Sequence, residues 1–217
     1  MNFKQVFDFL ERLNANNHKD WMDENRNEYH QIKQDLYEWL LDVDKELVNV
    51  DPDYYPVQSK KSINRINNNL LFHPNKPTYK DHFGMGLDQK PGKSDFYIHL
   101  GIEECFLAGG FYKPKKSVLA SIRDAIDYDG EKLKEILEDP VFKENFGQLT
   151  DEDKLTNPPK GFSKTHPHIE LLKHKNFAID KPISKEIVLS SKFKQEIINT
   201  YKVGLPFRRY LNHAVSV

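Results

Sequence analysis

The sequence predicts an α+β fold, and two changes of hydrophobic period along its 217 residues carry this prediction. Helical spacing of apolar residues dominates the start of the chain, an alternating pattern replaces it in the middle third, and helical spacing then returns. Strands in one block with helices before and after it are typical of α+β proteins rather than of a doubly wound sheet. We therefore expect an antiparallel meander of about four to five strands, with N-terminal helices, helices after the sheet and a C-terminal helix.

Two helices are predicted before the sheet. The first has its apolar face at helical spacing and ends in the polar stretch Asn14 to Asn17. The second is longer, runs from about Trp21 to Leu47 and stops at Asp51-Pro52, because a proline cannot continue a helix. The apolar face of the first helix consists of Phe3, Val6, Phe7, Leu10 and Leu13.

The strands are predicted from alternation. Residues 96–100 and 105–110 place apolar and other side chains in turn, so we expect two neighbouring strands there, antiparallel because their connection is short. Further strands are expected at about His82 to Leu87 and near Ser59 to Ile66, which would extend the meander. A short strand is expected near Phe177 to Ile179.

The second half of the chain is mainly helical in pattern. Apolar residues recur at helical spacing over residues 118–126 and again over 133–137, before Pro140. Thr165 is expected to cap a helix that has Pro167 in its first turn, and a last helix should run from about Ser190 to His213. Because no low-complexity linker interrupts residues 1–217, we expect a single domain.

Composition narrows the class of protein. No apolar run approaches the roughly 18 residues of a spanning helix, and the N-terminus lacks the pattern of an export signal, so no membrane partner is expected. The single cysteine, Cys105, leaves no internal disulfide and agrees with a reducing compartment. We therefore expect a cytoplasmic protein.

Several motifs that could carry chemistry fail on inspection. The run Gly86 to Ser94 resembles a phosphate-binding P-loop but has five residues between its glycines and leads into a strand, so a hairpin loop is the better interpretation. Glu103 and Glu104 should raise the pKa of the Cys105 thiol and disfavour a nucleophile. His166, His168, His174 and Glu170 lack the spacing of a two-histidine metal face, so neither metal nor cofactor is expected.

The informative feature is where acidic residues are missing. From Tyr54 to Lys80 there is no Asp or Glu, while Lys60, Lys61, Arg65, Lys76 and Lys80 give that stretch a charge of +5. Residues 106–123, 154–169 and 197–217 are also acid-free and carry further Lys and Arg. Brought together, these segments would form a basic cleft for an anion, whereas kept apart they would be solvated edges. A net charge of −1 argues against broad nucleic-acid binding.

Several segments resemble the domain-of-unknown-function 2461 family of bacteria and fungi. The resemblance is carried by residues 16–21, Arg65-Ile66 with Phe72, the cluster Lys76 to Lys80, residues 108–112, 159–162 and His166-Pro167. It covers nearly the whole chain and implies a single α+β domain without an established reaction. Asn68 and Leu71 stand where the family pattern has arginines, and Asn69 and Asn75 stand where it has aspartates. A mechanism based on those carboxylates therefore does not carry over.

The best functional interpretation is a binding module with a basic cleft for a small phosphate- or carboxylate-bearing ligand. One alternative is an enzyme acting on a phosphorylated or nucleotide-like substrate, with Tyr79, His99 or His166 as proton donor, and another is a scaffold with a vestigial site. The arginines could instead pair with helix carboxylates or cap carbonyls. The ligand, any reaction and the oligomeric state stay open, and the candidate ligand-binding residues are Arg26, Arg65, Lys76, Tyr79, Lys80, Arg123 and Lys160.

Overall fold

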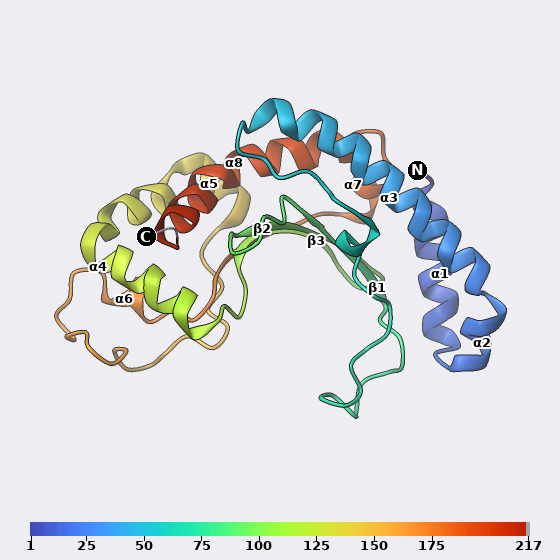
Figure 1. Cartoon of the computed structure of the whole chain (residues 1–217), viewed down its shortest axis with the longest axis horizontal. Helices are drawn as coiled ribbons and strands as arrows, with labels where there is room; N and C mark the ends of the chain where they lie inside the picture. Colours follow the sequence, from blue (N-terminus) through green and yellow to red (C-terminus); the bar gives the residue numbers. More distant parts are fainter. Residues whose placement is uncertain (216–217) are drawn as a thin grey trace. The chain divides into compact units, whose positions relative to one another are not determined.

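The computed structural model describes residues 1–215, and within them the chain forms eight α-helices, one short 3-10 helix and one four-stranded sheet (Figure 1). This confirms the α+β class and the antiparallel meander. The elements are α1 (Phe3–Ala15), α2 (Lys19–Glu24), α3 (Arg26–Val50), η1 (Lys60–Ser62), β1 (His82–Leu87), β2 (Asp95–Gly101), β3 (Cys105–Phe111), α4 (Lys116–Glu138), α5 (Pro140–Phe146), α6 (Ile169–Leu172), β4 (Phe177–Pro182), α7 (Lys185–Leu189) and α8 (Phe193–Ala214).

The sheet has the order β1-β2-β3-β4, so each strand pairs with its neighbour in sequence. Burial alternates along β2 and β3, which places Phe96, Ile98 and Leu100 in the core and the intervening side chains on the other face. The predictions for β1, β2 and β3 are confirmed, and residues 88–94 form the connection between β1 and β2 where a hairpin loop was expected.

The chain divides into two compact units, and each is described by itself. Unit 1 consists of residues Met1–Gln89, Tyr97–Leu107 and Pro182–Ile198. Unit 2 consists of Lys90–Phe96, Ala108–Lys181 and the chain from Asn199 onward. The expectation of one domain over residues 1–217 stays a prediction.

In unit 1 the N-terminal helices pack against the start of the sheet. Figure 1 shows α1 and α3 as neighbouring blue helices. Aromatic side chains of both helices contact the ring of Phe83 in strand β1. Phe83 of β1 lies 6.4 Å from Phe9 of α1 and stacks at 6.1 Å on Tyr29 of α3, between ring centroids. Aromatic residues therefore supply much of this core.

Unit 2 has its own apolar core. Side chains of α4, α5, α6, β4 and α8 form a continuous buried cluster, with Phe142 and Phe207 6.0 Å apart between ring centroids. Helix α4 carries a kink at Asp129, whose backbone angles are φ −147° and ψ 59°. The buried members of the cluster include Ile122, Ile126, Leu133, Phe142, Phe146, Leu172, Phe177 and Phe207.

Three local predictions are wrong. The long helix expected from Trp21 is split at Asn25, whose side-chain amide donates to the Trp21 carbonyl at 2.8 Å and competes with the helical ladder. The strand expected near Ser59 to Ile66 is instead the 3-10 turn η1 followed by a single bridge, because the Ser59 hydroxyl accepts from the Lys61 amide and starts a turn. Helix α6 begins after His168, since Thr165 bonds the Ser163 hydroxyl rather than a helix amide.

Sequence patterns also missed two short helices. Asp139 caps α5, with Pro140 in its first turn, and Ser184 caps α7. No helix in the described part of the chain is both long enough and apolar enough to cross a membrane.

Candidate functional site

Within the acid-free stretch Tyr54 to Lys80, residues 66–80 fold in unit 1 as a hairpin. Two backbone bonds close it, from the Lys80 amide to the Ile66 carbonyl at 2.8 Å and from the Asn68 amide to the Thr78 carbonyl at 3.0 Å. The Asn68 side chain adds a third bond, to the Pro77 carbonyl at 2.9 Å. Asn68 therefore stabilises the hairpin through both its backbone and its side chain.

Tyr79 anchors this hairpin to the N-terminal helices. Its amide donates to Asn17 Oδ1 at 2.8 Å, and its carbonyl accepts from Asn17 Nδ2 at 3.0 Å. The Tyr79 side chain is buried, with 4% of its surface exposed. We therefore assign Tyr79 a positioning role, because a buried ring clamped through its backbone offers little surface to a ligand.

Three cations of the predicted site lie on the hairpin, Arg65 and Lys80 at its base and Lys76 beside the turn at its tip. Lys80 Nζ donates to the Arg65 carbonyl at 2.8 Å. Burial, followed by the charges of Arg65 and Lys76, lowers the pKa of Lys80. Within residues 1–215, none of these three residues forms an ion pair with a carboxylate. The positive charge at this place is therefore not neutralised inside the protein.

Arg26 also belongs to unit 1, but its guanidinium is already engaged. It forms an ion pair with Asp23, which also pairs with Lys19 at 2.8 Å. The hydrogen bond that Arg26 donates to the Asp23 carboxylate raises the pKa of Arg26. This pairing with a helix carboxylate is the internal role that the sequence left open for the arginines.

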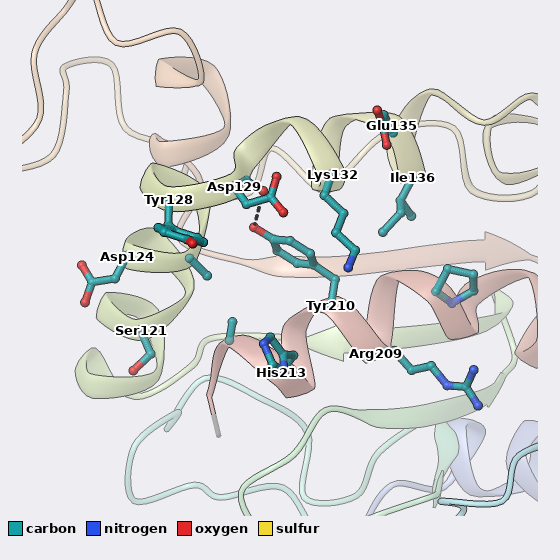
Figure 2. A pocket seen from close by; sticks show the side chains of 13 residues that line it. Ser121, Asp124, Tyr128, Asp129, Lys132, Glu135, Ile136, Arg209, Tyr210 and His213 are labelled. Atoms are coloured by element: carbon teal, nitrogen blue, oxygen red, sulfur yellow. Dashed lines mark hydrogen bonds between the residues drawn. The ribbon is translucent and has the colours of Figure 1, made fainter. Parts of the chain in front are cut away.

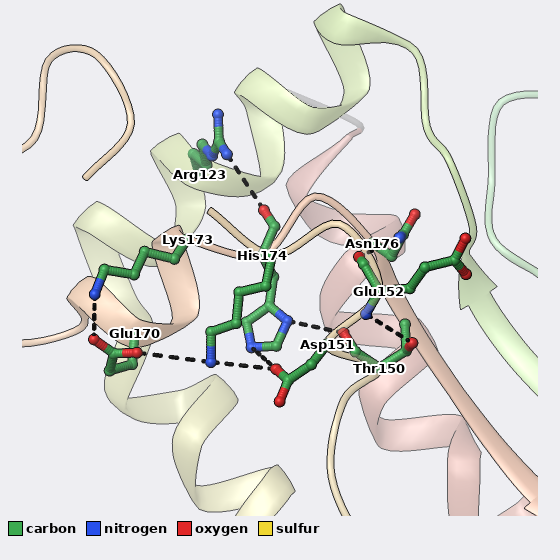
Figure 3. A network of polar contacts seen from close by, with 9 residues as sticks. Arg123, Thr150, Asp151, Glu152, Glu170, Lys173, His174 and Asn176 are labelled. Atoms are coloured by element: carbon green, nitrogen blue, oxygen red, sulfur yellow. Dashed lines mark hydrogen bonds and ion pairs between the residues drawn. The ribbon is translucent and has the colours of Figure 1, made fainter. Parts of the chain in front are cut away.

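The remaining two candidates, Arg123 and Lys160, lie in unit 2. Arg123 Nε donates to the Leu172 carbonyl at 3.0 Å, and Nη2 donates to the His174 carbonyl at 3.3 Å, as Figure 3 shows for the second bond. Arg123 thus caps the last carbonyls after α6. Lys160 is exposed on the loop before α6. Both residues therefore belong to a different unit from Arg65, Lys76 and Lys80.

Other cations of the acid-free segments in unit 2 have internal partners. Lys113 pairs with Glu152 at 2.9 Å, and Lys154 pairs with Asp151 at 3.3 Å. Arg208 is 1% exposed and donates through Nη2 to the Ser94 carbonyl at 2.8 Å. Ser216 and Val217, which end the last acid-free segment, lie outside the described residues. Lys113 and Lys154 therefore form ion pairs within unit 2, and Arg208 is buried there.

A second cluster in unit 1, which sequence reasoning did not assemble, lies across β1, β2 and β3 on the face opposite the core. His82 and His99 stack with ring centroids 4.2 Å apart, and His99 stacks on Phe106 at 4.4 Å. His82 Nδ1 lies 2.8 Å from Asp81 Oδ1. The alternation of β2 was the signal that could have found this cluster, because it places His99 and Tyr97 on one face.

The charge states of this cluster define what it can do chemically. Burial and the neighbouring His82 lower the pKa of His99 to about 4, so its imidazole is neutral near pH 7. His99 is therefore a poor proton donor at that pH, contrary to its candidate role in an enzyme. His82 is oriented by Asp81 and lies at the same cavity. Asp81, His82 and His99 line a cavity of about 230 Å³.

Cys105 is a buried core residue of β3, as its pattern suggested. The pKa of its thiol is raised mainly by burial, and Glu104 contributes least among the named causes. The direction was predicted correctly from the sequence, but the principal cause was not. No group of three or more His, Cys, Asp or Glu side chains in residues 1–215 is arranged to hold a metal ion.

Unit 2 contains a larger cavity of about 870 Å³ between α4 and α8. In Figure 2, Tyr210 of α8 points across it toward α4, where its hydroxyl donates to the Asp129 carbonyl at 3.3 Å. Burial raises the pKa of Tyr210 to about 12. Lys132 and Arg209 share the lining with acids, so the cavity has no single sign of charge. The Asp129-Gly130 pair was the turn signal for the kink that shapes this wall.

Comparison with known proteins gives a family. Neither a curated protein nor a solved structure matches the chain. Residues 5–210 match the model of a family described as conserved hypothetical protein, DUF2461. This is the family whose motifs the sequence resembles, and the match covers nearly the whole chain. The chain therefore belongs to the DUF2461 family.

Proposed function

We propose that this chain is a cytoplasmic binding module for a small phosphate- or carboxylate-bearing ligand, held in unit 1 by Arg65, Lys76 and Lys80. The observation that carries the proposal is the hairpin itself. Its backbone pairing fixes Lys80 beside Arg65 in a segment without a single acid. Arginine offers a planar fork and lysine a point charge, a combination suited to an oxyanion.

The electrostatics support the same assignment. A half-buried ammonium next to two other cations raises the free energy of the unliganded protein, since neither burial nor its neighbours favour its charge. An anion between these groups would favour the charged form of Lys80 and so offset the cost of burial and of the neighbouring cations. Arg26, Arg123, Lys113 and Lys154 already have protein partners and gain less from a ligand.

Thermal unfolding with inorganic phosphate at constant ionic strength tests the proposal. A ligand present at about ten times its Kd stabilises the native state by about 1.4 kcal/mol. For a protein of this size that corresponds to a rise in Tm of about 3–6 °C. We expect this rise for the wild-type chain and its loss in Arg65→Gln/Lys80→Gln, with citrate as the carboxylate probe.

The matched controls are Arg26, which is already paired with Asp23, and Lys160, which belongs to unit 2. Arg26→Gln and Lys160→Gln each remove one cation of the same type elsewhere, so both should keep the phosphate response. A response that is equal in all variants would mean general ion effects and would remove the basis of the proposal.

A further inference from the structure

The hairpin of the proposed anion site ends in an exposed apolar tip. Leu70, Leu71 and Phe72 are consecutive, and 39%, 85% and 71% of their surfaces are exposed. The other exposed large apolar side chains in residues 1–215 are isolated in sequence, for example Val48 and Leu189. Single exposed apolar residues are ordinary, whereas a contiguous group marks an interaction surface.

The tip is a defined turn. The Asn69 carbonyl accepts from the amides of Phe72 at 3.2 Å and His73 at 3.0 Å, and a second turn joins Lys76 to the His73 carbonyl at 3.1 Å. In Figure 1 this teal-green segment extends beyond the end of strand β1. The backbone therefore holds the apolar side chains at the end of the hairpin, with the cations Arg65 and Lys80 at its base.

We propose that this hairpin docks on an anionic membrane surface, with Leu71 and Phe72 entering the interface and Arg65, Lys76 and Lys80 contacting lipid phosphate groups. This proposal rests on the anion site and names its ligand as a lipid headgroup. Proteins bind anionic lipid surfaces when apolar or aromatic side chains insert into the interface beside basic residues. The absence of Asp and Glu from Tyr54 to Lys80 leaves no charge in the hairpin that a phosphate would repel.

The order of residues favours a lipid surface over a second protein copy. The cations at the base of the hairpin complement the charge of the lipid phosphates, and the apolar side chains lie beyond them at the tip. The base would therefore contact the phosphate layer while the tip reaches the deeper acyl boundary. Because three residues cannot bury much area, the apolar tip and the cations must act together, as stable peripheral binding requires two signals.

Vesicle sedimentation with the full chain tests this inference. The vesicles contain three parts phosphatidylcholine to one part phosphatidylserine, and pure phosphatidylcholine vesicles serve as the neutral comparison. We expect binding to the anionic vesicles that weakens as salt is raised, because exposed charges are screened. Leu71→Ser/Phe72→Ser should lower the binding constant by about tenfold or more, and Lys76→Gln should lower it by about fivefold.

Two further measurements separate the outcomes. Leu189→Ser removes an exposed leucine elsewhere in unit 1 and should leave vesicle binding unchanged. In Phe72→Trp, brominated lipid should quench the new indole if the tip enters the interface. Leu71→Ser/Phe72→Ser should retain the response of Tm to inorganic phosphate, since it keeps all three cations.

The results that overturn the inference are distinct from those that overturn the anion site. If phosphate raises Tm but the wild-type chain ignores anionic vesicles, the lipid inference fails and the anion site stands. The inference also fails if Leu71→Ser/Phe72→Ser binds vesicles as well as the wild type, or if size-exclusion chromatography shows a dimer that this variant dissociates. If phosphate has no effect on Tm, the anion site itself fails.

Discussion

At the scale of single residues, the neighbours of a side chain decide its charge. His99 is held between the rings of His82 and Phe106, where water is scarce and a second imidazole is close. Its pKa of about 4 lies below the value of about 6.5 for an unperturbed histidine. The unfolded chain therefore binds the proton more readily than the folded one between these two pH values.

This difference predicts a pH dependence of stability. The contribution of neutral His99 is complete above about pH 6.5 and is lost as pH falls toward 4, a loss of about 3 kcal/mol in the free energy of unfolding. Chemical denaturation of His99→Phe across this range should show a correspondingly shallower decline. His30→Gln, an exposed control, should follow the wild type. Identical profiles for all three proteins would show that protonation of His99 does not cause the loss of stability at low pH.

The residue scale also shows what a sequence can and cannot supply about a site. Arg26, Arg65 and Arg123 are equivalent in a list of cations, yet one pairs with Asp23, one caps carbonyls and only Arg65 stays in the uncompensated cluster. The positive charge of these arginines could be predicted, because the sequence alone determines it. Their partners could not be predicted, since pairing depends on contacts that only the folded chain makes.

At the scale of elements, close strand pairing fixes the glycines of β3. Gly110 has φ +115°, and a Cβ atom there would lie 2.2 Å from the Phe177 carbonyl oxygen of β4. The structure therefore shows tight packing of Gly110 against the neighbouring strand.

Gly110→Ala should therefore be severely destabilising, by about 3 kcal/mol or more, because positive φ and a backbone clash add together. Gly92→Ala is the matched control. It also has positive φ, at +78°, but no atom lies within 4 Å of its added Cβ, so about 1 kcal/mol is expected. Urea unfolding of the two variants gives the comparison, and equal losses would refute the clash.

Elements with strong periodic patterns were predictable, and short ones were not. The alternation of β2 and β3 and the apolar face of α1 reflect burial directly, so sequence and structure agree. The segment around Ser59 to Ile66 also looked extended, but a hydroxyl-capped turn and one bridge replaced the strand. Local side-chain bonds decided that outcome, and such bonds leave little periodic signal.

At the scale of the whole molecule, the separation of charge is the property that suggests a ligand. The net charge is −1, so attraction of an anion must come from a local concentration of cations rather than from the total. In unit 1 that concentration persists around Arg65, Lys76 and Lys80, whereas in unit 2 cations such as Lys113 and Lys154 have acidic partners. The acid-free segments thus differ in how their cations are paired, although they look alike in sequence.

The central claim is that Arg65, Lys76 and Lys80 form one anion site, and titration of inorganic phosphate followed by NMR tests it most directly. The account predicts amide shifts concentrated in residues 64–68 and 76–81, together with a rise in the pKa of Lys80 as the bound anion favours its charged form. Shifts centred on Lys160, or scattered over surface lysines with the pKa of Lys80 unchanged, would contradict it.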